Sequence, residues 1–593
     1  MKLHCTSPIL QTDGQNFKCD LALVKDENDI AVYKFTLASD VLVSPKPVSV
    51  KFVFNKDDVY SVFHPNAYGI CTPLPDWSPV KNRSRSGSGA PLVSLIGRTD
   101  NNRCTVSLSD CKNPTCISAG LHEEDCTVLL NIAFFTETVS PLKEYSAEIR
   151  LDLRDIPACE SIRSVRAWWK EIGYVSAALP VSATLPMYST WYSMHQDFTA
   201  DKIKEQCAIA KGSGMDTVII DDGWQTDDNN RGYAYCGDWE VCTKKLPDFK
   251  ALVNDLHSIG MKVMVWFSVP YVGKNSKCAE RFVGKYLYYD DNIGAYVLDP
   301  RFPQTRSYLC GVYERFAKTY GIDGFKLDFI DSFFLTEESQ KGDLGDCISL
   351  EDGICKLLDE IESTLKSVNP DMMIEFRQTY MGGVMQRYGN MIRVSDCPAN
   401  AQINKFASLE LRLLSYGVAV HADPIVWRTD ESAENAAMQL NHTLFAVPQI
   451  SMDLTKLPLS HKKMLAYYME YQRKNKDILL FGDLSVSGFI HGFTSAVASN
   501  GRKKIYVAFD GIVGVQAGDF DVVNATGNDR VALKTTEPTD CFVTVVNCTG
   551  ETVRKERVHL SNGINEISVP VSGFAFFAKD EDAATTAQAQ AQK

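Results

Sequence analysis

The stretch Asp248-Phe-Lys-Ala-Leu-Val-Asn-Asp-Leu-His-Ser-Ile-Gly-Met-Lys-Val-Met-Val-Trp-Phe267 places a helical pattern directly before a strand pattern. Asp248 is a favourable N-cap residue, and Gly260 stands where a glycine commonly follows the end of a helix. The side chains expected to form the buried stripe of this helix are Leu252, Val253, Leu256 and Ile259. The apolar run that follows, residues 262–267, predicts a buried strand. The stretch is therefore one helix–strand unit of an α/β pattern.

The same alternation fills residues 181–477. Thr199 is the expected N-cap of another helix, which should end near Gly212. Eight apolar runs predict strands, at residues 187–191, 217–221, 262–267, 324–329, 373–376, 391–395, 418–421 and 449–453. Eight strand–helix repeats match a (β/α)8 TIM barrel, whose active site lies at the C-terminal ends of the strands. Side chains at those ends are therefore the first candidates for chemistry.

Two β-rich regions flank the predicted barrel. Residues 1–180 carry short alternating runs such as Val48-Ser-Val-Lys-Phe-Val-Phe54, a pattern typical of a β-sandwich. Residues 478–580 repeat this texture, for example in Cys541-Phe-Val-Thr-Val-Val546, and predict a second, smaller β-sandwich domain. Residues 581–593, rich in Ala, Gln and Thr, are expected to be a disordered tail. The fold class is thus multidomain, with a central barrel between two β domains.

Composition narrows the ligand class. The 593 residues include 61 Lys and Arg against 74 Asp and Glu, a formal charge of −13. Without a basic stripe, this balance disfavours nucleic acid and anionic membranes and suits a neutral small substrate. The chain starts without a signal-peptide pattern, which favours the cytoplasm unless a leader was removed. The 18 cysteines show no metal-finger or Cys-x-x-Cys spacing, so free thiols are expected, and a homo-oligomer is left open.

Acidic residues stand at three predicted strand ends. Asp221 and Asp222 end the second strand, where two adjacent acids are costly unless they bind something, although Asp222 could instead form a turn before glycine. Lys326 and Asp328 share one face of the fourth strand, so the ammonium should keep the carboxylate ionised, unless the two form only a structural ion pair. Asp396 follows the sixth strand, where helix capping is the alternative. Two facing carboxylates are the minimum equipment of a glycosidase.

Tryptophans near the strand ends also favour a sugar ligand. Their ring faces and N–H groups suit the mixed apolar and hydroxyl surface of a pyranose, although core packing would explain about half of them. The residues concerned are Trp191, Trp224, Trp239, Trp266 and Trp427. Phosphate-loop, dinucleotide and zinc-protease motifs are missing from the sequence, so we expect neither cofactor nor metal.

These motifs make residues 187–424 resemble glycoside hydrolase family 36, the α-galactosidase and α-N-acetylgalactosaminidase family. The matching motifs are Ile220-Asp-Asp-Gly-Trp224, Gly237-Asp-Trp239, Leu246-Pro-Asp-Phe249, Gly260-Met-Lys-Val-Met-Val-Trp-Phe267, Asp323-Gly-Phe-Lys-Leu-Asp-Phe329 and Ser395-Asp396. Each motif is moderately specific, and their order along a barrel is strong support. The flanking β domains also agree with the layout of that family.

The resemblance implies a retaining exo-acting α-galactosidase on oligosaccharides or glycoconjugates. It makes Asp328 the nucleophile and Asp396 the general acid and base. It also implies that Asp221 and Asp222 accept hydrogen bonds from the sugar O4 and O6 hydroxyls. Lys326 would bind ring hydroxyls, and Trp224 and Trp266, with Trp191, would line the pocket.

Two departures keep other functions open. Family members commonly carry Cys-Ser-x-Gly-Gly-Gly-Arg after the fifth strand, where this chain has Glu375-Phe-Arg-Gln-Thr-Tyr-Met-Gly-Gly383. That loop usually meets the C2 substituent, so Arg377 is a candidate there and N-acetylgalactosamine is an alternative sugar. The third strand ends Trp266-Phe-Ser-Val-Pro270 without the expected acidic residue. A transglycosidase, an α-glucosidase-like enzyme and a non-catalytic carbohydrate-binding protein are also compatible with the sequence.

Overall fold

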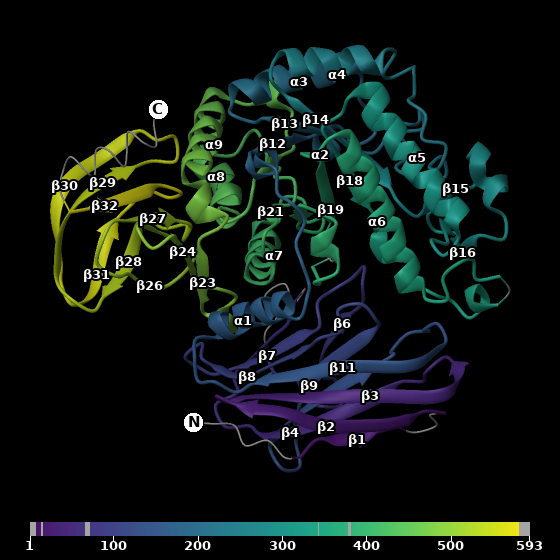
Figure 1. Ribbon diagram of the computed structural model, residues 1–593. Helices are drawn as coiled ribbons and strands as arrows, with labels where there is room; N and C mark the ends of the chain where they lie inside the picture. Colours follow the sequence, from purple (N-terminus) through teal and green to yellow (C-terminus); the bar gives the residue numbers. More distant parts are fainter. Residues whose placement is uncertain (1–6, 13–15, 66–71, 342, 378–380, 580–593) are drawn as a thin grey trace.

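The computed structural model describes residues 7–579, apart from 13–15, 66–71, 342 and 378–380. A central barrel lies between an N-terminal sandwich, below it in Figure 1, and a C-terminal β domain at its side. The predicted fold class is confirmed, while the tail expected at residues 581–593 lies outside the described residues. Within the described part of the chain, no helix combines the length and apolarity needed to cross a membrane.

The N-terminal domain consists of two antiparallel sheets. The first has the order β1 (Ile9–Gln11), β4 (Val48–Asn55), β10 (Thr127–Phe134), β9 (Thr115–His122) and β6 (Val80–Ser84). The second has the order β2 (Lys18–Glu27), β3 (Ile30–Val43), β11 (Leu142–Asp152), β8 (Asn102–Leu108), β7 (Leu92–Ile96) and β5 (Ser61–Phe63). Alternating side chains of both sheets, among them Phe35, Phe52 and Phe134, form one fully buried core.

Helix α1 (Ala158–Glu171) lies in a region where only strands were expected. Ile162, Val165 and Trp169 are buried at helical spacing, a pattern the β-sandwich interpretation overlooked. The helix contacts β7 and β8 on one side and α7 (Ala401–Leu414) and β23 (Asp483–Ser487) on the other. In Figure 1 it lies between the sandwich and the barrel. It therefore joins the three domains.

The barrel strands form one eight-stranded parallel sheet. Their order is β21 (Ala419–His421), β20 (Met391–Arg393), β19 (Met373–Arg377), β18 (Gly324–Asp328), β14 (Lys262–Ser268), β13 (Thr217–Ile220), β12 (Met187–Ser189) and β22 (Gln449–Ile450). A parallel bridge between His421 and Val447 brings β21 beside the residues that precede β22. All eight predicted strands are present, but β12 and β22 are shorter than expected, because the chain turns into short helices after them.

Helices surround the sheet, as Figure 1 shows. They are α2 (Trp191–Met194), α3 (Ala200–Gly212), α4 (Phe249–Ser258), α5 (Pro303–Tyr320), α6 (Leu350–Val368), α7 (Ala401–Leu414), α8 (Ala433–His442) and α9 (Leu459–Leu479). Thr199 and Asp248 cap α3 and α4 by accepting backbone N–H bonds, as predicted. Ile259 was wrongly assigned to the buried stripe of α4, because the helix ends before it and 41% of the residue is exposed.

Smaller sheets complete the fold. A three-stranded sheet of β15 (Tyr271–Gly273), β17 (Ala295–Leu298) and β16 (Tyr286–Asp290) follows β14. The main C-terminal sheet has the order β23 (Asp483–Ser487), β24 (Ser495–Ser499), β25 (Lys504–Ala508), β27 (Phe520–Asn524), β32 (Phe574–Ala578), β29 (Thr539–Val546) and β30 (Thr552–Leu560). A second, three-stranded sheet packs with it and has the order β26 (Ile512–Gly514), β28 (Arg530–Thr535) and β31 (Gly563–Ser568).

The sixteen cysteines in the described part of the chain are free thiols.

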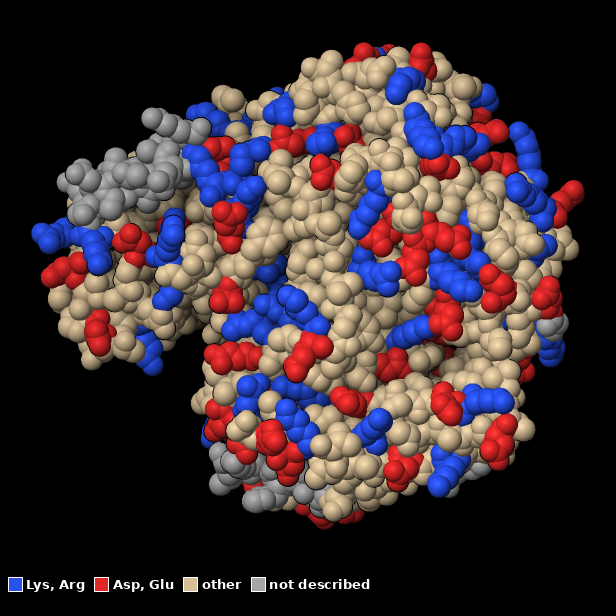
Figure 2. All heavy atoms as spheres, viewed as in Figure 1, with Lys and Arg blue, Asp and Glu red and all other residues tan. Residues whose placement is uncertain are grey.

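Surface charge is mixed in sign. Figure 2 shows Lys and Arg interspersed with Asp and Glu over the visible face of all three domains. A continuous basic stripe, which a nucleic-acid partner would require, is not seen on that face.

The start of β18 requires a glycine. A Cβ atom on Gly324 would lie 2.7 Å from Cβ of Met373 and 2.9 Å from Cγ of Met264 on the two neighbouring strands. We expect Gly324→Ala to lower the free energy of unfolding by about 1–3 kcal/mol, because the barrel strands must separate. The matched control is Gly311→Ala within α5, where a Cβ meets nothing within 4 Å. That change should stabilise by about 0.5–1 kcal/mol. Urea unfolding measures both, and equal effects would contradict the expectation.

Candidate active site

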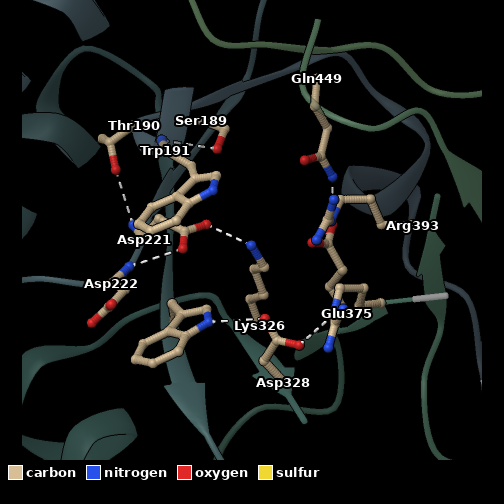
Figure 3. Close-up of polar contacts among 12 residues, drawn as sticks. Ser189, Thr190, Trp191, Asp221, Asp222, Lys326, Asp328, Glu375, Arg393 and Gln449 are labelled. Atoms are coloured by element: carbon tan, nitrogen blue, oxygen red, sulfur yellow. Dashed lines mark hydrogen bonds and ion pairs between the residues drawn. The ribbon is translucent and has the colours of Figure 1, made fainter. Parts of the chain in front are cut away.

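The predicted acids gather at the C-terminal ends of neighbouring barrel strands. Asp221 and Asp222 follow β13, Asp328 ends β18, and Asp396 lies beyond β20. Figure 3 shows the Lys326 ammonium of β18 directed toward Asp221, which follows β13, with Asp328 at the end of the same strand as Lys326. Because β13, β14, β18, β19 and β20 are consecutive in the sheet, their C-terminal ends lie at the same rim of the barrel.

Asp328 is 6% exposed and is held by three donors. Its Oδ1 accepts from Arg377 Nε at 2.8 Å and from the Phe329 backbone N–H at 2.9 Å. Its Oδ2 accepts from Trp266 Nε1 at 3.1 Å. Burial raises the pKa of this carboxyl, but Arg377, Lys326 and Arg393 outweigh burial and hold the pKa well below its ordinary value. Asp328 is therefore ionised at neutral pH.

Backbone strain accompanies this placement. Phe329 has a φ of 66°, in the left-handed region that a bulky residue rarely adopts. Its N–H points at Asp328 Oδ1, and its ring lies under the Arg377 guanidinium at 5.0 Å. Such strain persists only where the surroundings impose it, and it is common at functional sites.

Lys326 forms its hydrogen bond with Asp221 and acts on Asp328 through its charge. Its Nζ donates to Asp221 Oδ2 at 2.6 Å, whereas the guanidinium of Arg377 is the direct partner of Asp328. Lys326 still contributes to the low pKa of Asp328 through its charge, second to Arg377. Burial lowers the pKa of Lys326, but the charges of Asp221, Asp328 and Glu375 together raise it above its ordinary value, and the ammonium remains charged. The predicted charge effect of Lys326 is thus present, with Asp221 as its hydrogen-bond partner.

Asp222 is held by two amides. Gln196 Nε2 donates to its Oδ2 and Gln225 Nε2 to its Oδ1, each at 2.7 Å. Asp221 Oδ1 accepts the backbone N–H of Asp222 at 2.9 Å. Burial raises the pKa of Asp222 to about 6, so neutral donors hold a carboxyl that titrates near neutrality.

Asp396 is the most exposed of these four acids, with 49% of its side chain exposed. Arg393 Nη2 donates to its Oδ1 at 2.9 Å. Burial and the charge of Asp328 raise the pKa of Asp396, but Arg393 and Lys326 leave it below its ordinary value. Asp396 and Asp328 therefore interact electrostatically across the site.

The tryptophans divide into three roles. Trp191 is half-buried, lies near Asp221 in Figure 3 and packs against the Arg231 guanidinium at 5.4 Å. Trp266 is 2% exposed, so it holds Asp328 through its N–H rather than offering a broad wall. The pocket-wall prediction for Trp224 is wrong, because this residue is 0% exposed and donates to the Trp266 carbonyl at 2.8 Å. It supports Trp266 from within the core.

Three buried charged residues were not identified from the sequence. Arg393 on β20, Glu375 on β19 and Asp423 after β21 are 1%, 0% and 0% exposed. Arg393 Nη1 donates to Asp423, and its Nε lies 3.6 Å from Glu375 Oε1. Figure 3 shows Arg393 and Glu375 side by side, with Gln449 donating to Glu375. Charged residues inside the apolar runs Met373-Ile-Glu375 and Met391-Ile-Arg393 were the signal that could have revealed them.

The N-terminal domain contacts the segment that follows β18. Arg85, just after β6, donates to the backbone carbonyls of Asp331 at 2.6 Å and Phe333 at 3.1 Å, directly beyond the Asp328 strand.

Among the described residues, no cluster of His, Cys, Asp and Glu has the arrangement of a metal site.

The stabilities contributed by Lys326 and Asp221 should be coupled, because the two buried charges form a pair. Both side chains are at most 5% exposed, so Lys326→Met should cost about 3–5 kcal/mol of unfolding free energy by leaving a buried carboxylate unpaired. Lys326→Met with Asp221→Asn should cost less than Lys326→Met alone. The control pair is Glu314 and Lys318 on the surface of α5, whose loss should cost about 0.5 kcal/mol or less. Additive losses at Lys326 and Asp221 in urea unfolding would refute the coupling.

Short stretches of the sequence align with known α-galactosidases. AgaSK, a bifunctional α-galactosidase/sucrose kinase of Mediterraneibacter gnavus, is 33% identical over 107 residues, or 17% of this chain and 10% of that protein. α-Galactosidase Mel36A of Lactobacillus acidophilus is 32% identical over 93 residues, or 15% and 12%. These alignments span only about a tenth of each relative's length.

Solved structures share the whole architecture. The family 36 α-galactosidase AgaA from Geobacillus stearothermophilus superposes with a TM-score of 0.63 at 14% identity, covering 98% of this chain and 87% of that one. An α-galactosidase from Lactobacillus brevis gives 0.61 at 14% identity, covering 98% and 86%. The model of the family described as Melibiase matches residues 181–482, which is more than half of the chain. The protein therefore belongs to the melibiase family, and its resemblance to glycoside hydrolase family 36 is confirmed.

Proposed function

We propose that the protein is a retaining exo-α-galactosidase that releases terminal α-galactosyl groups from oligosaccharides or glycoconjugates. The observation that carries this proposal is the ionised Asp328, which is fixed by Arg377 and Trp266 and whose charge acts on a second carboxyl, Asp396. An ionised, immobilised carboxylate is suited to attack at an anomeric carbon. A second carboxyl at the same mouth is suited to proton transfer.

Sugar binding is assigned to the acids after β13. Asp221 and Asp222 are each 2% exposed, with their oxygens held by Lys326, Gln196 and Gln225. A carboxylate fixed in this way can accept hydrogen bonds from hydroxyl groups at defined angles. Since galactose and glucose differ only in the direction of O4, fixed acceptors at that position discriminate between them.

The reaction follows in two steps. Asp328 attacks the anomeric carbon and forms a glycosyl ester, while the bond to the leaving oxygen breaks and Asp396 donates its proton to that oxygen. Asp396, now ionised, then removes a proton from water, and the resulting oxygen displaces Asp328 with overall retention. Before the first step, the negative charge of Asp328 opposes the lowering of the Asp396 pKa by Arg393 and Lys326. Ester formation removes that charge, which favours the ionised form of Asp396 that the second step needs.

The named relatives support this choice of substrate. AgaA from Geobacillus stearothermophilus, which is 30% identical over 94 residues, has been solved with raffinose and with stachyose, both as variants. By analogy, raffinose-type oligosaccharides are the first natural substrates to test here.

Arg377 favours a second candidate within the same class. Its guanidinium lies against Asp328, next to the side of the cavity where the C2 substituent is expected. A guanidinium there can donate a hydrogen bond to a hydroxyl oxygen at C2. Transfer to another sugar is also compatible with the site, because water and sugar acceptors use the same two acids. An α-galactosyl transglycosidase is therefore the alternative activity, and an α-N-acetylgalactosaminidase the alternative specificity.

Azide rescue distinguishes the two acids. Asp328→Ala should lower kcat on an aryl α-galactoside by about 10⁴-fold or more, and azide should restore turnover as the β-galactosyl azide, formed by one displacement. Asp396→Ala should retain turnover of activated aryl substrates, and azide should yield the α-galactosyl azide, formed by two displacements. Product anomers are read by NMR.

The matched control is Asp323→Asn. Asp323 immediately precedes β18 at the opposite end of the barrel, where its carboxylate pairs with His257 and Lys262. This variant should keep its kcat and give no rescue. Full activity of Asp328→Ala would exclude Asp328 as nucleophile, and undiminished sugar binding without wild-type turnover would indicate a carbohydrate-binding protein.

A substrate panel tests specificity. Aryl α-galactoside should be cleaved with kcat/KM at least about 10²-fold above aryl α-glucoside, because Asp221 and Asp222 select the axial O4. Asp221→Asn should reduce this ratio. Preference for the N-acetylgalactosaminide would reassign the sugar, and transfer products formed with free sucrose or galactose would identify a transglycosidase. Chromatography of the products separates these outcomes.

A further inference from the structure

One guanidinium binds two carboxylates beside the cavity. Arg393 Nη2 donates to Asp396 Oδ1 at 2.9 Å, while Nη1 donates to Asp423 Oδ1 and to the Val394 carbonyl. The Arg393 side chain is 2% exposed, whereas that of Asp396 is 49% exposed. A buried arginine thus donates to an exposed carboxylate.

Asp423 is itself fixed from several sides. Its Oδ2 accepts from the Tyr192 hydroxyl at 2.9 Å and from the Cys397 backbone N–H at 2.7 Å. Its backbone N–H donates to the Asn404 side chain at 3.1 Å. Tyr192 belongs to α2 and Asn404 to α7, so one helix holds the carboxylate of Asp423 and another holds its backbone.

We infer that Arg393 is the positioning residue of the acid–base carboxylate Asp396, and that Asp423, held by Tyr192, keeps the guanidinium in place and offsets its charge. This inference rests on the proposed function of Asp396. None of the three residues needs to touch the sugar.

Charge balance limits the effect of Arg393 on Asp396. Arg393 and Lys326 hold the pKa of Asp396 below its ordinary value, whereas a general acid must carry a proton in the first step. Asp423 shares the positive charge of Arg393, and burial raises the pKa of Asp423 to about 7. Arg393, Lys326, Asp328 and Arg377 act on Asp396 through their charges, and Arg393 and Asp396 act on Asp423 in the same way. Cys397 and Tyr192 act on Asp423 through hydrogen bonds.

The sign of the pH effect follows. A general acid works only while protonated, so kcat/KM falls as pH rises through the pKa of Asp396. Arg393→Gln removes the cation that lowers the pKa of Asp396 most, and should move that fall to higher pH. Arg393→Lys keeps the charge but loses the two-carboxylate fork, so Asp396 should be misplaced.

Leaving-group dependence provides the kinetic test. With phenyl α-galactoside, which needs a proton donor, Asp423→Asn and Tyr192→Phe should lose about tenfold in kcat/KM and Arg393→Lys about 10²-fold. With 2,4-dinitrophenyl α-galactoside, whose leaving group needs no proton, all three should stay close to wild type. A purely structural role would lower both substrates equally, and that result would overturn the inference.

Two matched controls lie outside the site. Tyr471 donates to buried Asp521 at 2.8 Å, as Tyr192 does to Asp423, and Arg301 is a 1% exposed arginine paired with Asp299. Tyr471→Phe and Arg301→Lys should show no dependence on the leaving group. Dependence in either control would also overturn the inference. Tyr192→Phe keeps the test open if a charge variant fails to fold.

A substrate-free measurement separates this inference from the proposed function. In protein labelled with [γ-¹³C]aspartate, the resonance lost in Asp396→Asn identifies Asp396 and reports its titration by NMR. This titration should move to higher pH in Arg393→Gln, because the guanidinium lowers the pKa of Asp396. An unchanged titration would refute the inference even in an active enzyme. Failure of the wild type to cleave any α-galactoside, with the titration shifted, would refute only the proposed function.

Discussion

The compensation of buried charge at the C-terminal end of the barrel is the constraint on which the site depends. Carboxylates cannot enter this low-dielectric mouth without cations or hydrogen-bond donors. Lys326, Arg377 and Arg393 supply the positive charge, each from a different strand; Lys326 binds Asp221, Arg377 binds Asp328, and Arg393 binds both Asp396 and Asp423. The distribution of these cations keeps Asp328 ionised while leaving Asp396 at the solvent-exposed edge.

The flanking domains contribute by holding the edges of this mouth. Arg85 from the N-terminal sandwich binds backbone carbonyls just beyond Asp328. Helix α1 contacts the sandwich, α7 and the first strand of the C-terminal domain. Active-site loops on barrels gain precision from such rigid neighbours, because a small displacement of a reacting group costs rate. The three-domain arrangement therefore bears directly on the geometry of the proposed reaction.

Aromatic residues act here mainly as supports. Trp224 donates to the carbonyl of Trp266, and Trp266 in turn donates to Asp328. Both rings are nearly or fully buried, so their contribution to a sugar site is orientation of the nucleophile rather than stacking area. Trp191, which is half-buried near Asp221, is the ring whose exposure suits sugar contact.

The sequence by itself determined the alternation of strands and helices, the helix caps at Thr199 and Asp248, and the acids at the strand ends, because these depend on local spacing and periodicity. Only the tertiary structure decided which cation binds which acid. Lys326 and Asp221 are 105 residues apart, and the spacing along β18 gave no sign of their hydrogen bond. The pairing of Arg393 with Asp423 likewise arises from the register of adjacent parallel strands, which one-dimensional periodicity does not encode, whereas Asp396 is only three residues from Arg393 in the chain.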